Sequence, residues 1–497
     1  MADFSANLLA PIKVCLLTYG CQMNILDSQV LSGNLTRQGF TIVEDESEAD
    51  AVIFITCSVR DLAERKVLGK AGKLNVKRRR RPEVVLGVTG CMAELKGEEL
   101  LEGKNVFDFV AGTHKRHLIP EMILRALCRR VAAAEVTAAN AEHIERLGKA
   151  LAPYMEECLA SEGALLAVGK DPMSFGLDEL EAMRPRPWQA FVEIMRGCSN
   201  FCSYCVVPYA RGPEVSRPAE SILSELRALA VSGCVEVTLL GQNVNSYGKD
   251  LPAGSMSFPE LLKEAAKIEG IKWLRFVTSN PQDISDELIS LMASEKKICR
   301  YLHFPLQSGS NRILKMMNRK YTLEGYLEKV AKLRAAMPDL WLAGDLIVGF
   351  PGETREDFGE TLRAVEKIDY ANNFLFKYSE RPGTAAARLK DDVPLEEKKR
   401  RHAELMALQG RLTHEHLKSL VGTIQEVLVE GRSKRNRDVL QGRTTHYANV
   451  VFEGDPSLIG KFVQVRMESA TPLTLYGSCE RLTGEEKLTD EKETSGI

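Results

Sequence analysis

The chain has 497 residues, enough for about three domains of ordinary size. Charged residues make up 27% of it and hydrophobic residues 44%, which excludes a mainly disordered, collagen-like or coiled-coil protein. Lys and Arg total 66 against 68 Asp and Glu, so the net charge of −2 excludes binding to polyanions by bulk charge alone. Because no apolar run approaches the ~18–20 residues of a membrane helix and no signal peptide is evident, we expect a cytoplasmic chain without a membrane partner.

Twelve cysteines are the unusual feature of the composition. Cytosolic thiol buffers keep cysteines reduced, so disulfides are not expected in such a chain. Packed thiols, metal ligands and catalytic thiols remain as interpretations. The positions of the cysteines relative to the predicted strands distinguish these roles.

The first domain, predicted at residues 11–130, alternates short apolar runs with amphipathic stretches, as in an open parallel α/β sheet. Its predicted strands cover residues 13–19, 51–56, 84–89 and 107–110. Cys21, Cys57 and Cys91 each follow one of the first three strands, at the edge where open α/β sheets gather functional groups. One such cysteine would fit a packed thiol equally well, but three in the same position indicate metal ligation.

The rest of the chain divides into three further segments. Residues 131–186 are rich in Ala and Glu and predict a helical connector, which ends at the prolines of RPRP. A second strand–helix series at 187–415 predicts a partial (β/α)6 barrel with its active groups at the C-terminal strand ends. The pattern then changes to β-alternation, which predicts a small antiparallel barrel at 418–483 and completes a multidomain α/β protein. The expected strands of the central series are 190–195, 235–240, 273–277, 301–304, 342–348 and 373–379.

The loop after the first strand of this series reads RGCSNFCSYCVVPYARG and contains Cys198, Cys202 and Cys205. Three thiolates in one tight loop can bind three irons of a [4Fe–4S] cube and leave the fourth iron open to a cofactor or substrate. Structural zinc is the alternative, but it requires four nitrogen or sulfur ligands, and no fourth cysteine or histidine lies nearby.

This spacing, with Tyr204 before the last cysteine, resembles the radical S-adenosylmethionine (SAM) superfamily. From Lys13 to Leu482 the chain resembles one branch of it, the methylthiotransferases, which carry three separated cysteines, a radical SAM barrel and a C-terminal TRAM-type barrel. The segments that carry the resemblance are TYGCQMN, TCSVR, TGCMAE, the cysteine loop with VVPYARG, LLGQNVNSYG, HFPLQSGS and DLIVGFPGET.

The resemblance implies two [4Fe–4S] clusters. Cys198, Cys202 and Cys205 would hold the cluster that binds SAM and delivers the electron that cleaves it to a 5′-deoxyadenosyl radical. The first triad would hold an auxiliary cluster, whose methylthio group is transferred to the activated carbon. An electron donor such as flavodoxin or ferredoxin is implied, and we expect a monomer. The six cysteines expected to act as metal ligands and in catalysis are Cys21, Cys57, Cys91, Cys198, Cys202 and Cys205.

SAM contacts are expected at the ends of the barrel strands. For each of them a structural role in the loop is the alternative: Gly349 would serve only a turn, and Asp345 would cap a helix or pair with a cation. The expected cofactor-binding residues are Tyr204, Gly241, Gln242, Asn243, Gln307, Ser308, Asp345 and Gly349.

RNA is the expected substrate. The C-terminal segment carries SKRNR and QGRTTHYANVVF, and small barrels use such basic and aromatic groups to hold RNA. A nucleobase carbon is reached only in an unpaired nucleotide, which favours the anticodon loop of tRNA. The basic run KRRRR at 77–81 could contact phosphate but fits a solvated surface better.

Within the family the segments ITCSVR and CSYCVVPYARG look most like the MiaB type, which converts N6-isopentenyladenosine beside the anticodon to its 2-methylthio derivative. The alternatives are the branch that acts on threonylcarbamoyl-adenosine in tRNA and RimO-like modification of a ribosomal-protein aspartate. A non-catalytic iron–sulfur RNA-binding protein is a fourth interpretation.

Overall fold

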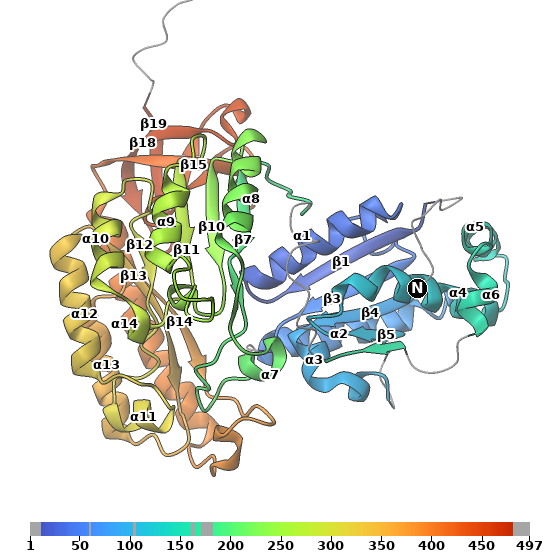
Figure 1. Ribbon diagram of the computed structural model, residues 1–497, viewed down its shortest axis with the longest axis horizontal. Coiled ribbons are helices and arrows are strands. Elements are labelled where there is room, and N and C mark those ends of the chain that lie inside the picture. The colour runs from blue at the N-terminus through green and yellow to red at the C-terminus, as the bar shows by residue number, and fades with distance from the viewer. Residues whose placement is uncertain (1–10, 59–60, 103–105, 161–164, 170–181, 481–497) are drawn as a thin grey trace, which may run out of the picture.

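A computed structural model describes residues 11–58, 61–102, 106–160, 165–169 and 182–480 of the chain (Figure 1). Its first part is a parallel sheet with strand order β2-β1-β3-β4-β5-β6. The central strands β3 and β4 are buried along their whole length, as expected for parallel strands covered on both faces. The strands are β1 (Lys13–Tyr19), β2 (Thr41–Ile42), β3 (Ala51–Thr56), β4 (Val85–Gly90), β5 (Phe109–Ala111) and β6 (Leu165–Ala167); the main helices are α1 (Gln22–Arg37), α2 (Asp61–Lys77), α3 (Cys91–Lys96) and α4 (Ile119–Ala133).

The expectation of a separate connector at 131–186 is wrong for much of that segment. Helices α5 (Ala141–Leu151) and α6 (Met155–Ala160) pack on α4, and α5 buries Leu147, Ala150 and Leu151 in the core of the first domain. Strand β6 then adds a parallel edge to the same sheet. A strand of three residues is too short to show an alternating pattern, so its place is determined by pairing with β5.

The central part contains the six expected parallel strands, in two adjoining three-stranded sheets. One sheet has the order β11-β10-β7 and the other β12-β13-β14, and both share one hydrophobic core with the surrounding helices. The strands are β7 (Gln189–Glu193), β10 (Glu236–Leu240), β11 (Trp273–Phe276), β12 (Tyr301–His303), β13 (Trp341–Val348) and β14 (Asn372–Lys377). The outer helices are α8 (Ala219–Val231), α9 (Phe258–Ala266), α10 (Asp286–Ser294), α12 (Leu323–Ala336), α13 (Arg355–Ile368) and α14 (Leu395–Ser419).

The C-terminal part is a closed five-stranded barrel in the order β15-β16-β17-β19-β18. It was expected to be antiparallel, but β17 and β19 pair in parallel. In a closed ring with an odd number of strands, direction cannot alternate at every pair, so at least one pair must be parallel. The strands are β15 (Ile424–Arg432), β16 (Leu440–Thr444), β17 (Asn449–Glu453), β18 (Phe462–Ala470) and β19 (Leu475–Cys479).

This small barrel packs on the N-terminal ends of the central strands. Trp341, the first residue of β13, belongs to its hydrophobic core. Arg275 on β11 donates to the backbone oxygens of Thr444 and Thr445, each at 2.8 Å. The C-terminal barrel therefore lies at the opposite end of the central strands from the loops that follow them (Figure 1). Among the described residues no helix is long and apolar enough to cross a lipid bilayer.

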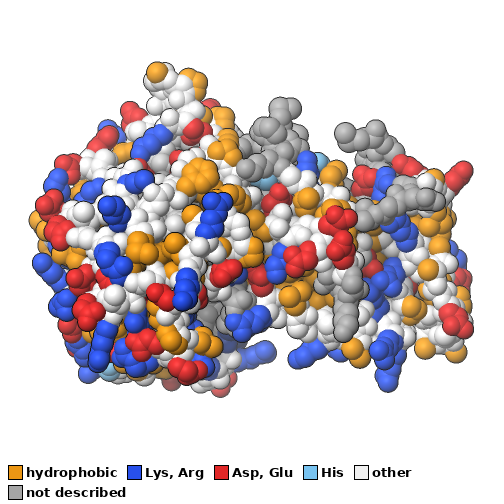
Figure 2. All heavy atoms as spheres, turned by 90° about the horizontal axis from the view of Figure 1, so that it is seen from below, with side chains coloured by type: hydrophobic (Ala, Val, Ile, Leu, Met, Phe, Trp, Pro, Cys, Tyr) orange, Lys and Arg blue, Asp and Glu red, His pale blue; other side chains and the backbone are white. Residues whose placement is uncertain are grey.

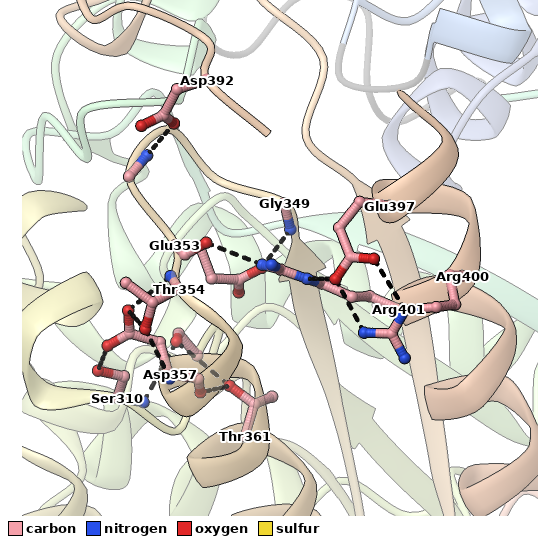
Figure 3. Close-up of polar contacts among 12 residues, drawn as sticks. Ser310, Gly349, Glu353, Thr354, Asp357, Thr361, Asp392, Glu397, Arg400 and Arg401 are labelled. Atoms are coloured by element: carbon pink, nitrogen blue, oxygen red, sulfur yellow. Dashed lines mark hydrogen bonds and ion pairs between the residues drawn. The ribbon is translucent and has the colours of Figure 1, made fainter. Parts of the chain in front are cut away.

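The segment DLIVGFPGET joins β13 to α13 through buried ionic contacts (Figure 3). Glu353 is fully buried, accepts a hydrogen bond from the backbone nitrogen of Gly349 at 2.6 Å, and pairs with Arg401 of α14 at 2.7 Å. Thr354 and Asp357 form a capping box at the start of α13, which satisfies backbone donors of its first turn. The turn after β13 is therefore fixed to the long helix α14.

Replacing Arg401 with Ala should lower the free energy of unfolding by about 3–5 kcal/mol, because it leaves the buried Glu353 carboxylate without its cation. The neighbouring Arg400 is 47% exposed and pairs with Glu397 and Glu404 at the surface, so the same change there should cost about 0–1 kcal/mol. Urea unfolding of the two variants provides the comparison. Equal destabilisation would show that the buried pair contributes no more than the exposed one.

Candidate iron–sulfur sites

The first three cysteines converge because their strands are neighbours in the sheet. Cys21 follows β1 and caps α1, Cys57 follows β3, and Cys91 is the first residue of α3 directly after β4. In the register of the sheet, Tyr19 pairs with Thr56 and Thr56 pairs with Gly90, so the three strands end side by side. The thiols of Cys21 and Cys57 are within hydrogen-bonding contact.

Glycines before two of these cysteines allow the close approach. Gly90 has φ = 100°, and a Cβ added to it would lie 2.4 Å from the carbonyl oxygen of Thr56. Gly20 has φ = 144°, and its added Cβ would lie 2.7 Å from the Cβ of Cys57. Neither position admits a side chain without moving a neighbouring strand end or its cysteine.

The surroundings of this triad favour anionic sulfur at one position. The hydrogen bond with Cys57 lowers the pKa of Cys21 to about 6, although burial opposes the shift, and the charge of Arg211 adds to the lowering. Burial raises the pKa of Cys91, against the opposing effect of Arg211. A cationic side chain that does not belong to this domain therefore lies close to the thiols of Cys21 and Cys91.

The second triad lies in the loop between β8 (Met195–Arg196) and the short helix α7 (Val207–Arg211). Cys198 donates its backbone N–H to Gly212, at 3.1 Å, and Cys205 donates to the carbonyl of Cys202, at 3.0 Å. All three residues are partly exposed to solvent. Burial raises the pKa of Cys205 to about 12, and the neighbouring Cys202 adds to the shift. The loop thus holds three sulfur atoms around its own backbone turn.

Neither triad forms a site for a single metal ion. Among the described residues no three Cys, His, Asp or Glu side chains lie close enough to hold one metal ion. A [4Fe–4S] cube instead takes each cysteine on a different iron, so its ligands are more widely spaced than those of one ion. Three cysteines at each site, without a fourth metal-binding side chain among the residues that the structure describes, fit a cube with one open iron better than tetrahedral zinc.

Arg319 is a residue of this site that sequence reasoning missed. It donates to the sulfur of Cys202 at 3.3 Å and, through Nε, to the hydroxyl of Tyr321 at 2.8 Å. Tyr204, expected as a cofactor contact, lies close enough to Cys202 and Arg319 for their charges to influence its pKa, which burial raises. Arg319 is 117 residues from Cys202 in sequence, and nothing in the local pattern distinguishes it from other arginines.

The expected GQN contact segment follows β10, as predicted. The side-chain oxygen of Gln242 accepts the backbone N–H of Gly197 at 2.5 Å, and Asn243 donates to Asp283 at 2.9 Å. The other polar atoms of these two side chains, Nε2 of Gln242 and Oδ1 of Asn243, are buried without a partner among the described residues. Gly241 packs against Met195, and an added Cβ would lie 2.6 Å from its side chain. The unpartnered amide atoms fit a polar ligand.

Two of the expected cofactor contacts make structural hydrogen bonds within their own loops. Ser308 is fully buried, and its hydroxyl accepts the backbone N–H of Ser310 at 3.2 Å. Gly349 has φ = 71° and gives its N–H to Glu353, which is the turn role given above as the alternative (Figure 3). A sequence motif marks both residues but does not show which way their polar groups point.

Asp345 and Gln307 keep positions compatible with ligand binding. The carboxylate of Asp345, on β13, lies 3.3 Å from Nε2 of His303 at the end of β12 and is partly exposed. Gln307 follows β12 with φ = 76°, and its backbone bridges β13 through Asp345 and Ile347. An ion pair with protonated His303 is therefore the structural alternative to a cofactor contact for Asp345.

Helix α7 brings the two sites to one interface (Figure 1). It packs on α3, and the hydroxyl of Thr113 donates to the carbonyl of Ala210 at 2.7 Å. Cys21 also packs with Leu240, the last residue of β10, in a small hydrophobic cluster between α1 and the central strands. The auxiliary triad is thus next to the strand ends that carry the GQN segment.

Three family models match the chain in the expected order. Residues 13–112 match the uncharacterized protein family UPF0004, residues 192–365 the radical SAM superfamily, and residues 418–479 the TRAM domain. Among solved structures, the radical SAM methyltransferase TsrM from Kitasatospora setae covers 76% of this chain and 77% of its own, with a TM-score of 0.51. At 15% identity this similarity shows a shared fold alone.

Curated relatives match over nearly the whole chain. The tRNA-2-methylthio-N(6)-dimethylallyladenosine synthase of Protochlamydia amoebophila is 43% identical over 96% of this chain and 100% of its own length. The enzyme of the same name from Syntrophomonas wolfei is 44% identical over 94% of this chain and 97% of its own. The chain therefore belongs to the MiaB-type tRNA methylthiotransferase family of radical SAM enzymes.

Proposed function

We propose that this enzyme adds a methylthio group to C2 of N6-dimethylallyladenosine beside the anticodon of tRNA. The observation that carries the proposal is the placement of two open cysteine triads at one interface, in a chain similar over its full length to enzymes named for this product. The electron donor would be a flavodoxin- or ferredoxin-type protein of the cytoplasm, and the enzyme would act as a monomer.

The two triads would have different roles. Cys198, Cys202 and Cys205 would hold the cluster that binds SAM, and the first triad would hold the auxiliary cluster; when bound, they supply the electron for SAM cleavage and the site of sulfur transfer. Arg319 holds the sulfur of Cys202 in position. The unpartnered amide atoms of Gln242 and Asn243 offer a donor and an acceptor to SAM.

The C-terminal barrel offers an RNA surface away from the cysteine sites. Its loop 433–439 exposes Lys434, Arg435 and Arg437 to solvent. Tyr447 is 36% exposed and stacks on the guanidinium of Arg443, 4.1 Å from the ring centroid. Since this barrel lies at the far end of the central strands, a substrate that reaches both places must be long, as an anticodon arm is and a free nucleoside is not.

The face of the molecule seen in Figure 2 shows no separate basic patch for RNA. On the face shown in Figure 2, Lys and Arg are interspersed with Asp and Glu. In the basic run at 77–81, Arg78 pairs with Asp108 at 2.7 Å and Arg81 with Glu83 at 3.3 Å, so part of that run serves the fold. The surface interpretation of the run fits Lys77, Arg79 and Arg80, which are exposed.

Product analysis separates this proposal from its alternatives. Nucleosides of tRNA from a deletion strain should lack the 2-methylthio derivative of N6-dimethylallyladenosine, while threonylcarbamoyl-adenosine derivatives and ribosomal protein should be unchanged by mass spectrometry. Release of 5′-deoxyadenosine from SAM by the reduced enzyme would exclude a non-catalytic iron–sulfur RNA-binding protein. Loss of a different modification in the deletion strain would assign the enzyme to another branch of the methylthiotransferase family.

Iron content tests the two-cluster assignment. After anaerobic reconstitution we expect about eight irons per chain, because each open triad would carry a four-iron cube. Replacing Cys198, Cys202 and Cys205 together with Ala should leave half the iron and half the sulfide. An active protein that contains zinc and no iron would contradict both assignments.

Binding of tRNA should depend on the exposed basic loop. Replacing Lys434, Arg435 and Arg437 with Gln should weaken binding and reduce the slope of log K against log salt by about 2–3, because each phosphate contact releases counterions. Replacing Lys332, which pairs with Asp286 on the outer helices, is the control and should leave the slope unchanged. Truncation of the barrel is a poorer test, since it would expose the core that Trp341 shares with it. Unchanged tRNA affinity in the loop variant would show that the RNA-binding surface lies elsewhere on the protein.

A further inference from the structure

Arg211 crosses from the radical SAM segment into the first domain. It is the last residue of α7, six positions after Cys205, and its side chain is only 4% exposed. Its guanidinium donates to the carboxylate of Asp27 on α1 at 2.8 Å, 184 residues away in sequence. Its charge also acts on the thiol of Cys91, the first residue of the helix on which α7 packs.

The buried charges around Arg211 do not balance. Asp27 accepts hydrogen bonds from both Arg211 and Arg116, one on each carboxylate oxygen. The three side chains are all buried, and no other carboxylate among the described residues forms an ion pair with either arginine. The buried Glu193 lies close enough to act on both arginines electrostatically, but its own ion pair is with Arg196, at 2.5 Å. Arg211 and Arg116 therefore share Asp27 as their ion-pair partner, and a buried charge without a full counter-ion is strongly unfavourable. The site requires further negative charge beside Arg211.

The groups that can supply this charge are the cysteines of the first triad. Arg211 lies close enough to both Cys91 and Cys21 to influence them electrostatically, and its helix packs on the helix that begins at Cys91. Thiolates that ligate a cluster carry negative charge, whereas neutral thiols do not. Arg116 reaches the same carboxylate from the opposite oxygen and has no such contact with a sulfur atom in the described structure.

We propose that Arg211 is a positioning residue for the auxiliary cluster, which holds a ligand sulfur at Cys91 and raises the reduction potential of the cluster bound there. The inference rests on the proposed function, which assigns that cluster to Cys21, Cys57 and Cys91. Reduction adds one electron and one negative charge to the cluster. Because Arg211 remains protonated throughout, its fixed positive charge stabilises the reduced state more than the oxidised state. No proton transfer is required.

The test uses the full-length protein in which Cys198, Cys202 and Cys205 are replaced by Ala, so that the auxiliary cluster is the one observed. Into this parent are introduced Arg211→Gln, Arg211→Lys and the matched control Arg116→Gln, which removes the other guanidinium from Asp27. Iron content is measured after reconstitution. The midpoint potential is then measured by dithionite titration followed by electron paramagnetic resonance.

We expect Arg211→Gln to lower the ratio of reduced to oxidised cluster about tenfold at a fixed solution potential, which equals about 59 mV for a one-electron couple. Arg211→Lys keeps the positive charge but lacks the planar guanidinium group, so its midpoint potential should lie between those of Arg211→Gln and the parent. Arg116→Gln should leave the potential unchanged. Equal shifts in Arg211→Gln and Arg116→Gln, or no shift in either, would overturn the proposal, because Arg211 would then serve only the ion pair between the domains.

Two further outcomes are decisive. If Arg211→Gln binds no iron, loading of Arg211→Lys and Arg116→Gln supports the proposal, and failure of both overturns it in favour of a structural ion pair. If the parent itself binds no iron, the cluster assignment in the proposed function fails, and this inference fails with it. The results for the Arg211 and Arg116 variants can be obtained only when the parent binds iron. Failure of this inference can therefore be distinguished from failure of the proposed function.

Discussion

Replacing Cys202 with Ala is expected to abolish the cleavage of SAM to 5′-deoxyadenosine. The thiol of Cys202 is one of three in the loop before α7 and accepts the hydrogen bond of Arg319, so its loss removes a proposed cluster ligand and the partner of that arginine together. A cube that lacks one of its three protein ligands cannot deliver the electron to SAM. Without SAM cleavage no methylthiolated nucleoside can form.

The measurement is chromatography of 5′-deoxyadenosine after reduction with dithionite, on protein reconstituted anaerobically. Cys234→Ala is the matched control, because this thiol is fully buried in the core of the same domain and donates to backbone oxygens of Trp188 and Glu236, away from both triads. That variant should keep SAM cleavage and lose some stability. Normal SAM cleavage by Cys202→Ala would show that this cysteine is not a ligand of the cluster.

Replacing Cys57 with Ala should separate the two reactions. Cys57 lies at the end of β3 in the first domain, so the loop of the second triad keeps all of its ligands. The reduced variant should still cleave SAM, but the auxiliary site would lack one ligand and methylthio-nucleoside should fall below detection. The two sites would then be assigned to separate steps of one reaction.

Both products are measured on the same reaction mixtures, 5′-deoxyadenosine by chromatography and methylthio-nucleoside by mass spectrometry. The control is Cys128→Ala, a buried thiol of the same domain that hydrogen-bonds Cys158 and lies in its hydrophobic core. This variant should form methylthio-nucleoside and 5′-deoxyadenosine in the same ratio as the wild-type enzyme. Full product formation by Cys57→Ala would show that this thiol is a packed core residue, and the sulfur-transfer assignment would be withdrawn.

The amino-acid sequence determined the strands, the cysteine positions and the order of the domains. Apolar runs such as AVIFIT predict buried strands locally, and the structure places β1 and β3 at the predicted residues. The cysteines could be interpreted because each stands in a fixed position after such a run, or within a loop of a few residues. These patterns extend over only a few residues each, so they can be recognised in the sequence without knowledge of the fold.

Only the tertiary structure decided which residues surround the sulfur atoms and how the segments close. Arg211 meets Asp27, and Arg319 meets Cys202, across 184 and 117 residues of chain. Strand β6 and the parallel pair of β17 and β19 depend on pairing with neighbours that no local pattern specifies. The physical reason is that hydrogen bonds and charge compensation depend on distance in space, which packing of whole helices and sheets establishes after the local elements have formed.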